Sequence, residues 1–179
     1  MPTVLDLCGG TGAWSAPYRE AGYDVVIVDL PHDVRLLRRP TYEVRGILAA
    51  PPCTVFASSG ARWIRTDDQM REGLSVVDAC LRLVWACRPR WWALENPVGK
   101  LVRYLGPPRL YFDPCEYGDP WTKRTCIWGE FVLPGQAVLP KKAPEFWGWR
   151  KLGGKSERTK RLRSVTPPGF ARAFFEANP

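Results

Sequence analysis

The stretch TVLDLCGGTGAW (Thr3–Trp14) decides the fold, because it joins an apolar run to a glycine-rich turn. The run predicts a short buried strand over Thr3–Leu7. The glycines allow a tight turn into a helix and a close approach of the backbone to a ligand. A second apolar run, DVVIVDL (24–30), carries Asp29, and an acidic side chain at a strand end can accept hydrogen bonds from ribose hydroxyls. Together the two runs predict a nucleoside-type cofactor site at the ends of two strands.

Strands and helices alternate along the rest of the chain. Further strands are predicted in RGILAAPPC (45–53), WWALEN (91–96), KRTCIWG (123–129) and EFVL (130–133), and helices in WSAPYREAGY (14–23), 67–89 and TPPGFARAFFEAN (166–178). The helix over 67–89 repeats apolar residues at helical spacing, with Asp67 as its expected N-cap. This alternation predicts one α/β domain over 1–179, with a mostly parallel sheet and helices on both faces. Ligands of such sheets bind at the carboxyl ends of the strands.

Composition narrows the class of protein. The chain has 179 residues, of which 45% are hydrophobic and 25% charged, as in one globular domain. It has no apolar run of the ~20 residues that a membrane helix needs, and its first residues lack the pattern of a secretion signal. We therefore expect a cytoplasmic protein without a membrane partner, whose six cysteines are thiols. Cysteine spacing and a single histidine argue against a metal site, and the lack of GxxxxGK[ST] argues against a nucleoside triphosphate hydrolase.

The net charge of +8 points to a polyanionic partner. Most of the excess lies in KKAPEFWGWRKLGGKSERTKRLR (141–163), where three aromatic residues are interleaved with lysine and arginine. Phosphates attract such cations and bases stack on such rings, so the segment favours nucleic-acid binding over a merely solvated loop. Glycine, proline and basic residues over 129–163 predict a loop or insertion rather than core.

Two strand ends carry reactive groups. LAAPPCTVFASSG (48–60) ends a predicted strand at two prolines and presents Cys53 at once, followed by small and polar residues that predict a loop able to move. WWALENP (91–97) ends in Glu95, and a carboxylate after four apolar residues is costly to bury unless it is paired or working. Both residues also have a structural interpretation. Most cysteines are buried parts of the core, and Glu95 can cap the next turn through backbone N–H groups. Because two strands deliver reactive groups to the same edge of the sheet, we favour a catalytic role over a structural one for both residues.

The motifs resemble, in order and across nearly the whole chain, those of the S-adenosylmethionine-dependent DNA cytosine-5 methyltransferases. DLCGGTGAW resembles the family's cofactor loop DLFxGxGG, and PPC with the following SSG resembles its nucleophile loop. LENP resembles the ENV motif, TKRTCIW (122–128) resembles QxRxR, and SVTPPGFARAF (164–174) resembles the closing motif. Asp29 resembles the ribose ligand, and Asp33 of HDVR the acceptor of the adenine amino group. A methyltransferase acting on amino groups would show a DPPY-like motif in place of PPC.

The resemblance implies a Rossmann-like methyltransferase fold and C5 methylation of cytosine in duplex DNA, with the target base flipped out. Cys53 would add to C6 of cytosine, Glu95 would hold a proton at N3, and Arg124 would contact the base or the nucleophile region. Besides Asp29 and Asp33, the implied cofactor residues are Asp6, Leu7, Cys8, Gly10, Gly12, Trp14, Leu30, Val34, Pro51, Ser164 and Val165. The implied DNA-binding residues are Pro52, Phe56, Ser58, Arg62, Arg65, Asn96, Lys123, Lys141, Lys142 and Arg163.

The chain departs from the family's pattern in three places. Only about 129–163 stands in place of a large target-recognition domain, so we expect relaxed or very short sequence preference, or a specificity partner. Cys126 replaces the second arginine of QxRxR, and Thr122 replaces its glutamine. Arg163 precedes Ser164 where the family has asparagine, and a cation there would suit a carboxylated donor, carboxy-S-adenosylmethionine, better than a sulfonium alone.

Three other functions are compatible with the same residues. One is methylation of cytosine in RNA or in a free nucleotide, which the lack of a recognition domain favours. Another is transfer of a carboxymethyl group from the carboxylated donor. The third is a non-catalytic nucleic-acid-binding protein on the same fold, for which Cys126 is the best support. The sequence leaves the oligomeric state open.

Overall fold

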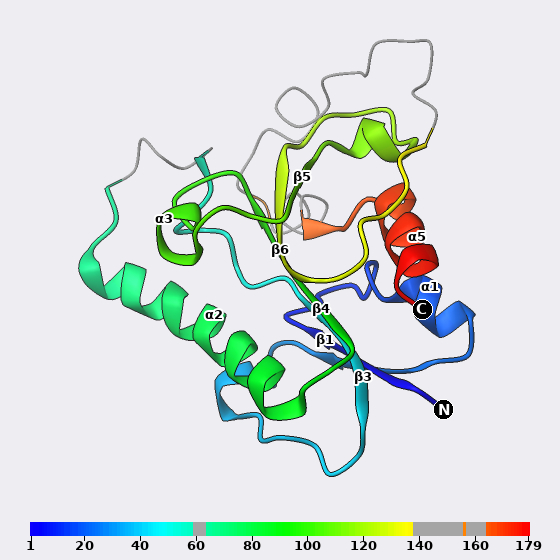
Figure 1. Cartoon of the computed structure of the whole chain (residues 1–179). Helices are drawn as coiled ribbons and strands as arrows, with labels where there is room; N and C mark the ends of the chain where they lie inside the picture. Colours follow the sequence, from blue (N-terminus) through cyan, green and yellow to red (C-terminus); the bar gives the residue numbers. More distant parts are fainter. Residues whose placement is uncertain (59–63, 138–155, 157–163) are drawn as a thin grey trace.

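In the described part of the chain, six strands form one sheet in the order β2-β1-β3-β4-β6-β5 (Figure 1). The computed structural model describes residues 1–58, 64–137, 156 and 164–179. The strands are β1 (Thr3–Leu7), β2 (Asp24–Val28), β3 (Val44–Ala49), β4 (Trp91–Pro97), β5 (Leu110–Phe112) and β6 (Thr125–Glu130). β1 pairs in parallel with β2 and β3, and β3 with β4, whereas β6 runs antiparallel to β4 and β5. The predicted mostly parallel sheet is confirmed.

Helices cover both faces of this sheet, as predicted (Figure 1). On one face, α2 (Asp67–Cys87) and the 3-10 turn η1 (Val34–Leu36) pack on β1 and β3. On the other face, α1 (Ala16–Glu20) and α5 (Pro168–Ala177) pack on the opposite side chains of the same strands. Two short elements, α3 (Val102–Leu105) and η3 (Pro114–Tyr117), lie in the connections after β4 and β5. Residues alternating along β1 therefore enter two separate cores.

The start of α2 differs from the expectation by one residue. Thr66, not Asp67, is the N-cap: its side chain accepts from the N–H of Gln69, and the Gln69 side chain accepts from the N–H of Thr66. This reciprocal arrangement satisfies two backbone donors that the first turn of a helix leaves open. The helix ends at Cys87, where Arg88 adopts a left-handed conformation just before Pro89.

The late strands were predicted less well. EFVL is not a strand, because both backbone polar groups of Val132 bond to the side chain of Asn178 at the end of α5. Phe131 is buried against α5, so the insertion predicted from residue 129 begins later than expected. β5, which pairs with β6, was missed. Residues 138–155 and 157–163 lie outside the described part. No helix in the described part is both long and apolar enough to cross a membrane.

Candidate functional site

The carboxyl ends of four neighbouring strands meet at one edge of the sheet. In register, Leu7 at the end of β1 stands beside Val28 of β2 and Ala49 of β3, and Ala49 stands beside Leu94 of β4. The glycine turn, Asp29, the Pro-Pro corner and Glu95 each come next along their own strand. The sheet therefore brings the two reactive strand ends to one edge, as predicted from the sequence.

The glycine turn folds over a buried carboxylate. Cys8, Gly10 and Gly12 all have positive φ, and a Cβ on Gly9 would lie 2.5 Å from Cγ of Asp6. Asp6 is fully buried. Its Oδ2 accepts a hydrogen bond from Ser15 Oγ, and its Oδ1 has no partner within the described residues. Burial raises the pKa of Asp6 from 3.8 to about 6, against the hydrogen bond from Ser15. An acceptor atom without a partner beneath such a turn fits a site that binds a ligand with N–H or O–H donors.

Replacing Asp6 by asparagine is expected to stabilise the ligand-free fold at pH 8. A carboxyl whose pKa is raised on folding stabilises the native state below its unfolded pKa, and this contribution is lost as pH rises through about 6. The Asp6→Asn variant should therefore exceed the wild type by about 3 kcal/mol in unfolding free energy at pH 8, and by little near pH 4. Urea unfolding at both pH values measures this, with the exposed Asp68→Asn as control. A pH-independent difference would contradict the assignment.

The two acidic residues assigned to ribose and adenine have different surroundings. Asp29 lies beside the glycine turn, its Oδ2 3.8 Å from the position of a Cβ on Gly10. Asp33, in contrast, is held by Arg35, whose guanidinium donates to both of its carboxylate oxygens and also to Glu72. These hydrogen bonds keep the pKa of Asp33 below its ordinary value. Asp29 is thus more accessible than Asp33 as a hydrogen-bond acceptor for the two hydroxyls of a ribose.

The remaining residues of the expected cofactor site differ in how deeply they are buried. Leu7 and Val34 are buried in the core between the sheet and α2, whereas Leu30 is exposed beyond β2. Trp14 is buried under α5, with its ring 5.6 Å from that of Phe174 between centroids. The C-terminal helix therefore packs against the end of the glycine turn. Ser164 and Val165, which precede α5, are exposed and half-buried.

The turn that carries Cys53 is fixed on two sides. The N–H groups of Phe56 and Ala57 both donate to the carbonyl of Cys53, and Phe56 is fully buried. Asn96 Nδ2 of β4 donates to the carbonyl of Pro51 over 2.9 Å, and an isolated bridge joins Ala57 to Gly99. The loop expected to move is thus held as far as residue 58.

The other residues assigned to DNA around this turn are placed as follows. Pro52 and Ser58 are exposed. The Arg65 guanidinium donates to the carbonyl of Thr54, so it is committed to the turn in the ligand-free chain. Arg62, Lys141, Lys142 and Arg163 lie outside the described residues.

Gly99 is required for this arrangement. A Cβ there would lie 2.0 Å from the carbonyl oxygen of Phe56 and 2.9 Å from the nitrogen of Ser58. Gly99→Ala should therefore cost about 1–3 kcal/mol and displace the Cys53 turn. Gly135→Ala is the matched control, because a Cβ at Gly135 meets no heavy atom within 4 Å. Thermal unfolding of both variants checks this, and equal midpoints would contradict the close contact.

Glu95 and Lys123 carry opposite charges, and both act electrostatically on the thiol of Cys53. The Glu95 side chain is 16% exposed, and its Oε1 lies 3.9 Å from Nζ of Lys123. Burial raises the pKa of Glu95, and Lys123 opposes this effect. The pKa of the Cys53 thiol is raised mainly by burial and further by the Glu95 carboxylate, while Lys123 lowers it. The three groups therefore form one electrostatically coupled unit.

Arg124 lies outside this unit, contrary to the role expected from its motif. Its guanidinium lies 3.2 Å from Asp113 Oδ2, 3.6 Å from Glu116 Oε1 and 5.7 Å from the centre of the Tyr111 ring. These partners come from β5 and η3, which the sequence interpretation missed, and they turn the side chain away. Cys126, in place of the second arginine, is fully buried in β6.

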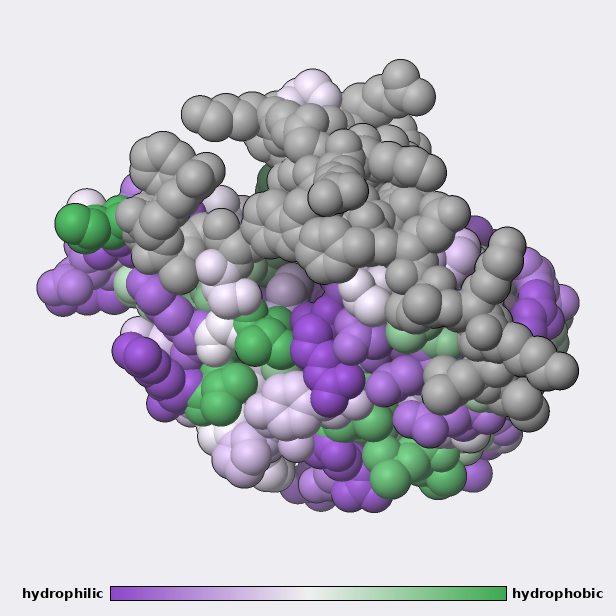
Figure 2. Space-filling view, turned by 90° about the horizontal axis from the view of Figure 1, so that it is seen from above, coloured by the Kyte–Doolittle hydropathy of each residue, from purple (hydrophilic) through white to green (hydrophobic). Residues whose placement is uncertain are grey.

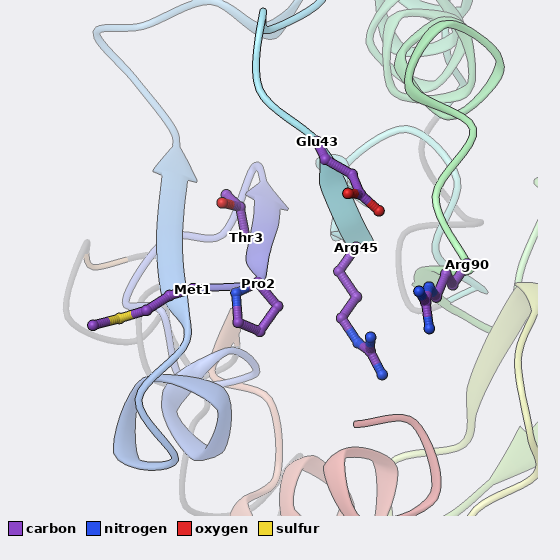
Figure 3. A pocket seen from close by; sticks show the side chains of 6 residues that line it. All are labelled: Met1, Pro2, Thr3, Glu43, Arg45 and Arg90. Atoms are coloured by element: carbon purple, nitrogen blue, oxygen red, sulfur yellow. The ribbon is translucent and has the colours of Figure 1, made fainter.

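A hollow of about 290 Å³ lies at the opposite edge of the sheet (Figure 3). Its lining includes Thr3 and Arg45, at the starts of β1 and β3, so it is remote from the strand ends that carry Cys53 and Glu95. The face seen from above mixes hydrophilic and hydrophobic side chains around the grey residues (Figure 2). Within the described residues, no cluster of three or more His, Cys, Asp or Glu side chains could hold a metal ion.

A comparison with solved structures supports the fold. No protein-family model matches the sequence, and no curated protein matches it. The structure is similar to a solved structure described as a "putative DNA modification methyltransferase encoded within prophage", from E. coli, with a TM-score of 0.54 and 19% sequence identity. The similarity covers 88% of this chain and 56% of that chain, so the chain spans little more than half of that protein's length. At this identity the comparison establishes a shared α/β fold.

Proposed function

We propose that this chain is an S-adenosylmethionine-dependent DNA cytosine-5 methyltransferase, with one Rossmann-like catalytic domain that acts in the cytoplasm. The observation that carries the proposal is the coupling of a half-buried thiol to a half-buried carboxylate at neighbouring strand ends. The hydrogen bond from Asn96 to Pro51 ties these two ends together. The Glu95 carboxylate also lies 3.9 Å from the Lys123 ammonium.

The residues around the glycine turn fit S-adenosylmethionine. The open acceptor on Asp6 and the carboxylate of Asp29 suit a ligand that carries an ammonium, a sulfonium and ribose hydroxyls. The positive φ angles of Cys8, Gly10 and Gly12 would let the backbone approach that ligand closely, and Trp14 packs against α5. Bound S-adenosylmethionine would supply the methyl group.

Cytosine needs activation because its C5 is a poor nucleophile. Addition of the Cys53 thiolate to C6 places electron density on C5 and makes it enamine-like. Glu95 holds a proton at N3 while negative charge builds on the ring. After C5 has been methylated, loss of its proton re-forms the double bond and expels Cys53. The thiolate thus supplies electron density to the ring at C6, and the carboxylic acid group stabilises the negative charge that builds up at N3.

DNA is the proposed substrate because the chain is basic. In a duplex, C5 and C6 are stacked, so the target base must be flipped out at a cost of about a few kcal/mol. Pro52 and Ser58 are exposed on the Cys53 turn and Arg65 bonds to it, so we propose that these residues meet the DNA strand. Lys141, Lys142 and Arg163 would add phosphate contacts that carry little sequence information, so we propose short or partner-dependent specificity.

Nucleoside mass spectrometry on DNA from cells that express the chain tests the proposal, beside cells that express Cys53→Ala. We expect 5-methylcytosine that depends on Cys53. A heavier acidic cytosine would instead indicate the carboxylated donor. Absence of any modified cytosine in DNA, with modified cytosine in RNA or nucleotides, would assign the second substrate class. Absence from all three pools, with retained DNA binding, would favour a non-catalytic binding protein.

A further inference from the structure

The segment just before β6 is held beside the Cys53 turn. Pro97 of β4 stands opposite Thr125 of β6, so the residues before β6 lie next to those that follow β4. The N–H of Val98 donates to the carbonyl of Arg124, and Thr125 Oγ1 donates to the carbonyl of Lys123. The same stretch after β4 bridges to the Cys53 turn through Gly99. A cation on this segment can therefore act on both reactive groups.

The two cations of the segment have different partners. Lys123 directs its ammonium to Glu95, on the side of the site, whereas Arg124 directs its guanidinium to Asp113 and Glu116. The Lys123 side chain is 31% exposed and that of Arg124 is 50% exposed. The cation nearer to the reactive pair is thus the lysine, at a position that the motif leaves unspecified.

We propose that Lys123, rather than Arg124, is the positioning residue of this site, whose ammonium stabilises the Cys53 thiolate against the neighbouring Glu95 carboxylate. Its role in the attack on cytosine rests on the proposed function. Its effect on the thiol does not, because it acts on the chain before any substrate binds.

Electrostatics explains why a cation is needed. Desolvation disfavours the thiolate, and the Glu95 carboxylate from β4 disfavours it further, so both raise the pKa of Cys53. Lys123 is the charged group that opposes them. Arg65 also faces the turn, but its guanidinium donates to the carbonyl of Thr54. Without the ammonium, only a backbone hydrogen bond among the described residues would oppose the effect of Glu95 on Cys53.

The test is the pH profile of Cys53 alkylation by iodoacetamide in the full chain, quantified on the Cys53 peptide by mass spectrometry. Because the thiolate reacts, a raised pKa slows the reaction at a fixed pH below it. We expect Lys123→Met to slow alkylation at pH 8 roughly 3–10-fold, with the ratio to wild type shrinking as pH rises. Lys123→Arg should restore most of the rate, and Arg124→Met should stay within about twofold of wild type.

Three results would overturn the proposal. One is an unchanged profile for Lys123→Met. Another is a ratio that does not vary with pH, because a purely structural change slows the reaction equally at every pH. The third is a larger effect from Arg124→Met. If the wild type forms no 5-methylcytosine but the profiles behave as expected, the proposed function fails and the role of Lys123 on the thiol stands.

Discussion

Replacing Cys53 by alanine is expected to abolish methyl transfer, with a rate loss of at least about 10⁴-fold. The reason is chemical: without a thiolate at C6, C5 of cytosine is too weak a nucleophile. Burial and the Glu95 carboxylate also raise the pKa of the Cys126 thiol, but Cys126 is fully buried in β6. The substitution removes a half-buried sulfur from a turn that is held by backbone hydrogen bonds, so folding should change little. Incorporation of labelled methyl groups into duplex DNA measures the loss.

Cys115→Ala provides the matched control. Cys115 is also half-buried and unbridged, but it belongs to η3. We expect this variant to retain wild-type methyl transfer and Cys53→Ala to retain DNA binding. Methyl transfer that survives Cys53→Ala would remove the thiol from the mechanism and leave only the shared fold.

Replacing Glu95 by glutamine is expected to change two rates in opposite directions. Methyl transfer should fall about 10²–10⁴-fold, because a neutral amide cannot hold a proton at N3 as charge builds on the ring. Alkylation of Cys53 by iodoacetamide should become faster, because the carboxylate raises the pKa of the thiol and its removal lowers it. Paired assays on one protein preparation measure both.

The opposite signs separate catalysis from stability. A variant that only loosens the fold would lose methyl transfer and would expose every thiol alike, so alkylation of Cys87 and Cys115 should be followed in parallel. Faster alkylation confined to Cys53 supports direct coupling. Slower alkylation of Cys53 in Glu95→Gln would show that the carboxylate activates the thiol, contrary to the electrostatics described here.

The parallel core of the fold could be predicted because local signals agree with the tertiary structure. β1 has the predicted bounds, Thr3–Leu7, since all five residues are buried and glycines follow at once. The end of β3 before Pro51 and the end of β4 at Pro97 follow from the same reasoning. β5 could not be predicted, because three residues carry too little periodicity.

The placement of Cys53 and Glu95 at one edge of the sheet could be predicted, but the pairing of Glu95 with Lys123 could not. Cys53 and Glu95 each follow an apolar strand, and parallel strands bring such positions to one edge. Lys123 and Arg124 are adjacent in sequence, and their side-chain directions depend on tertiary partners: Glu95 for Lys123, and Asp113 and Glu116 for Arg124. A family motif favours the arginine, whereas the tertiary contacts turn it away. Likewise, Asp33 pairs with Arg35, and Arg35 also pairs with Glu72, which lies 37 positions further along the chain.

The central claim is that the Cys53 thiol bonds to C6 of cytosine in DNA. Its most direct test incubates the wild-type chain and S-adenosylmethionine with duplex DNA that contains 5-fluorocytosine, and then locates any adduct by peptide mass spectrometry. Fluorine at C5 cannot leave as a proton does, so the adduct should persist. The account predicts a denaturation-resistant protein–DNA complex linked through Cys53 and absent in Cys53→Ala. An adduct on another residue, or none from a preparation that methylates ordinary DNA, would contradict it.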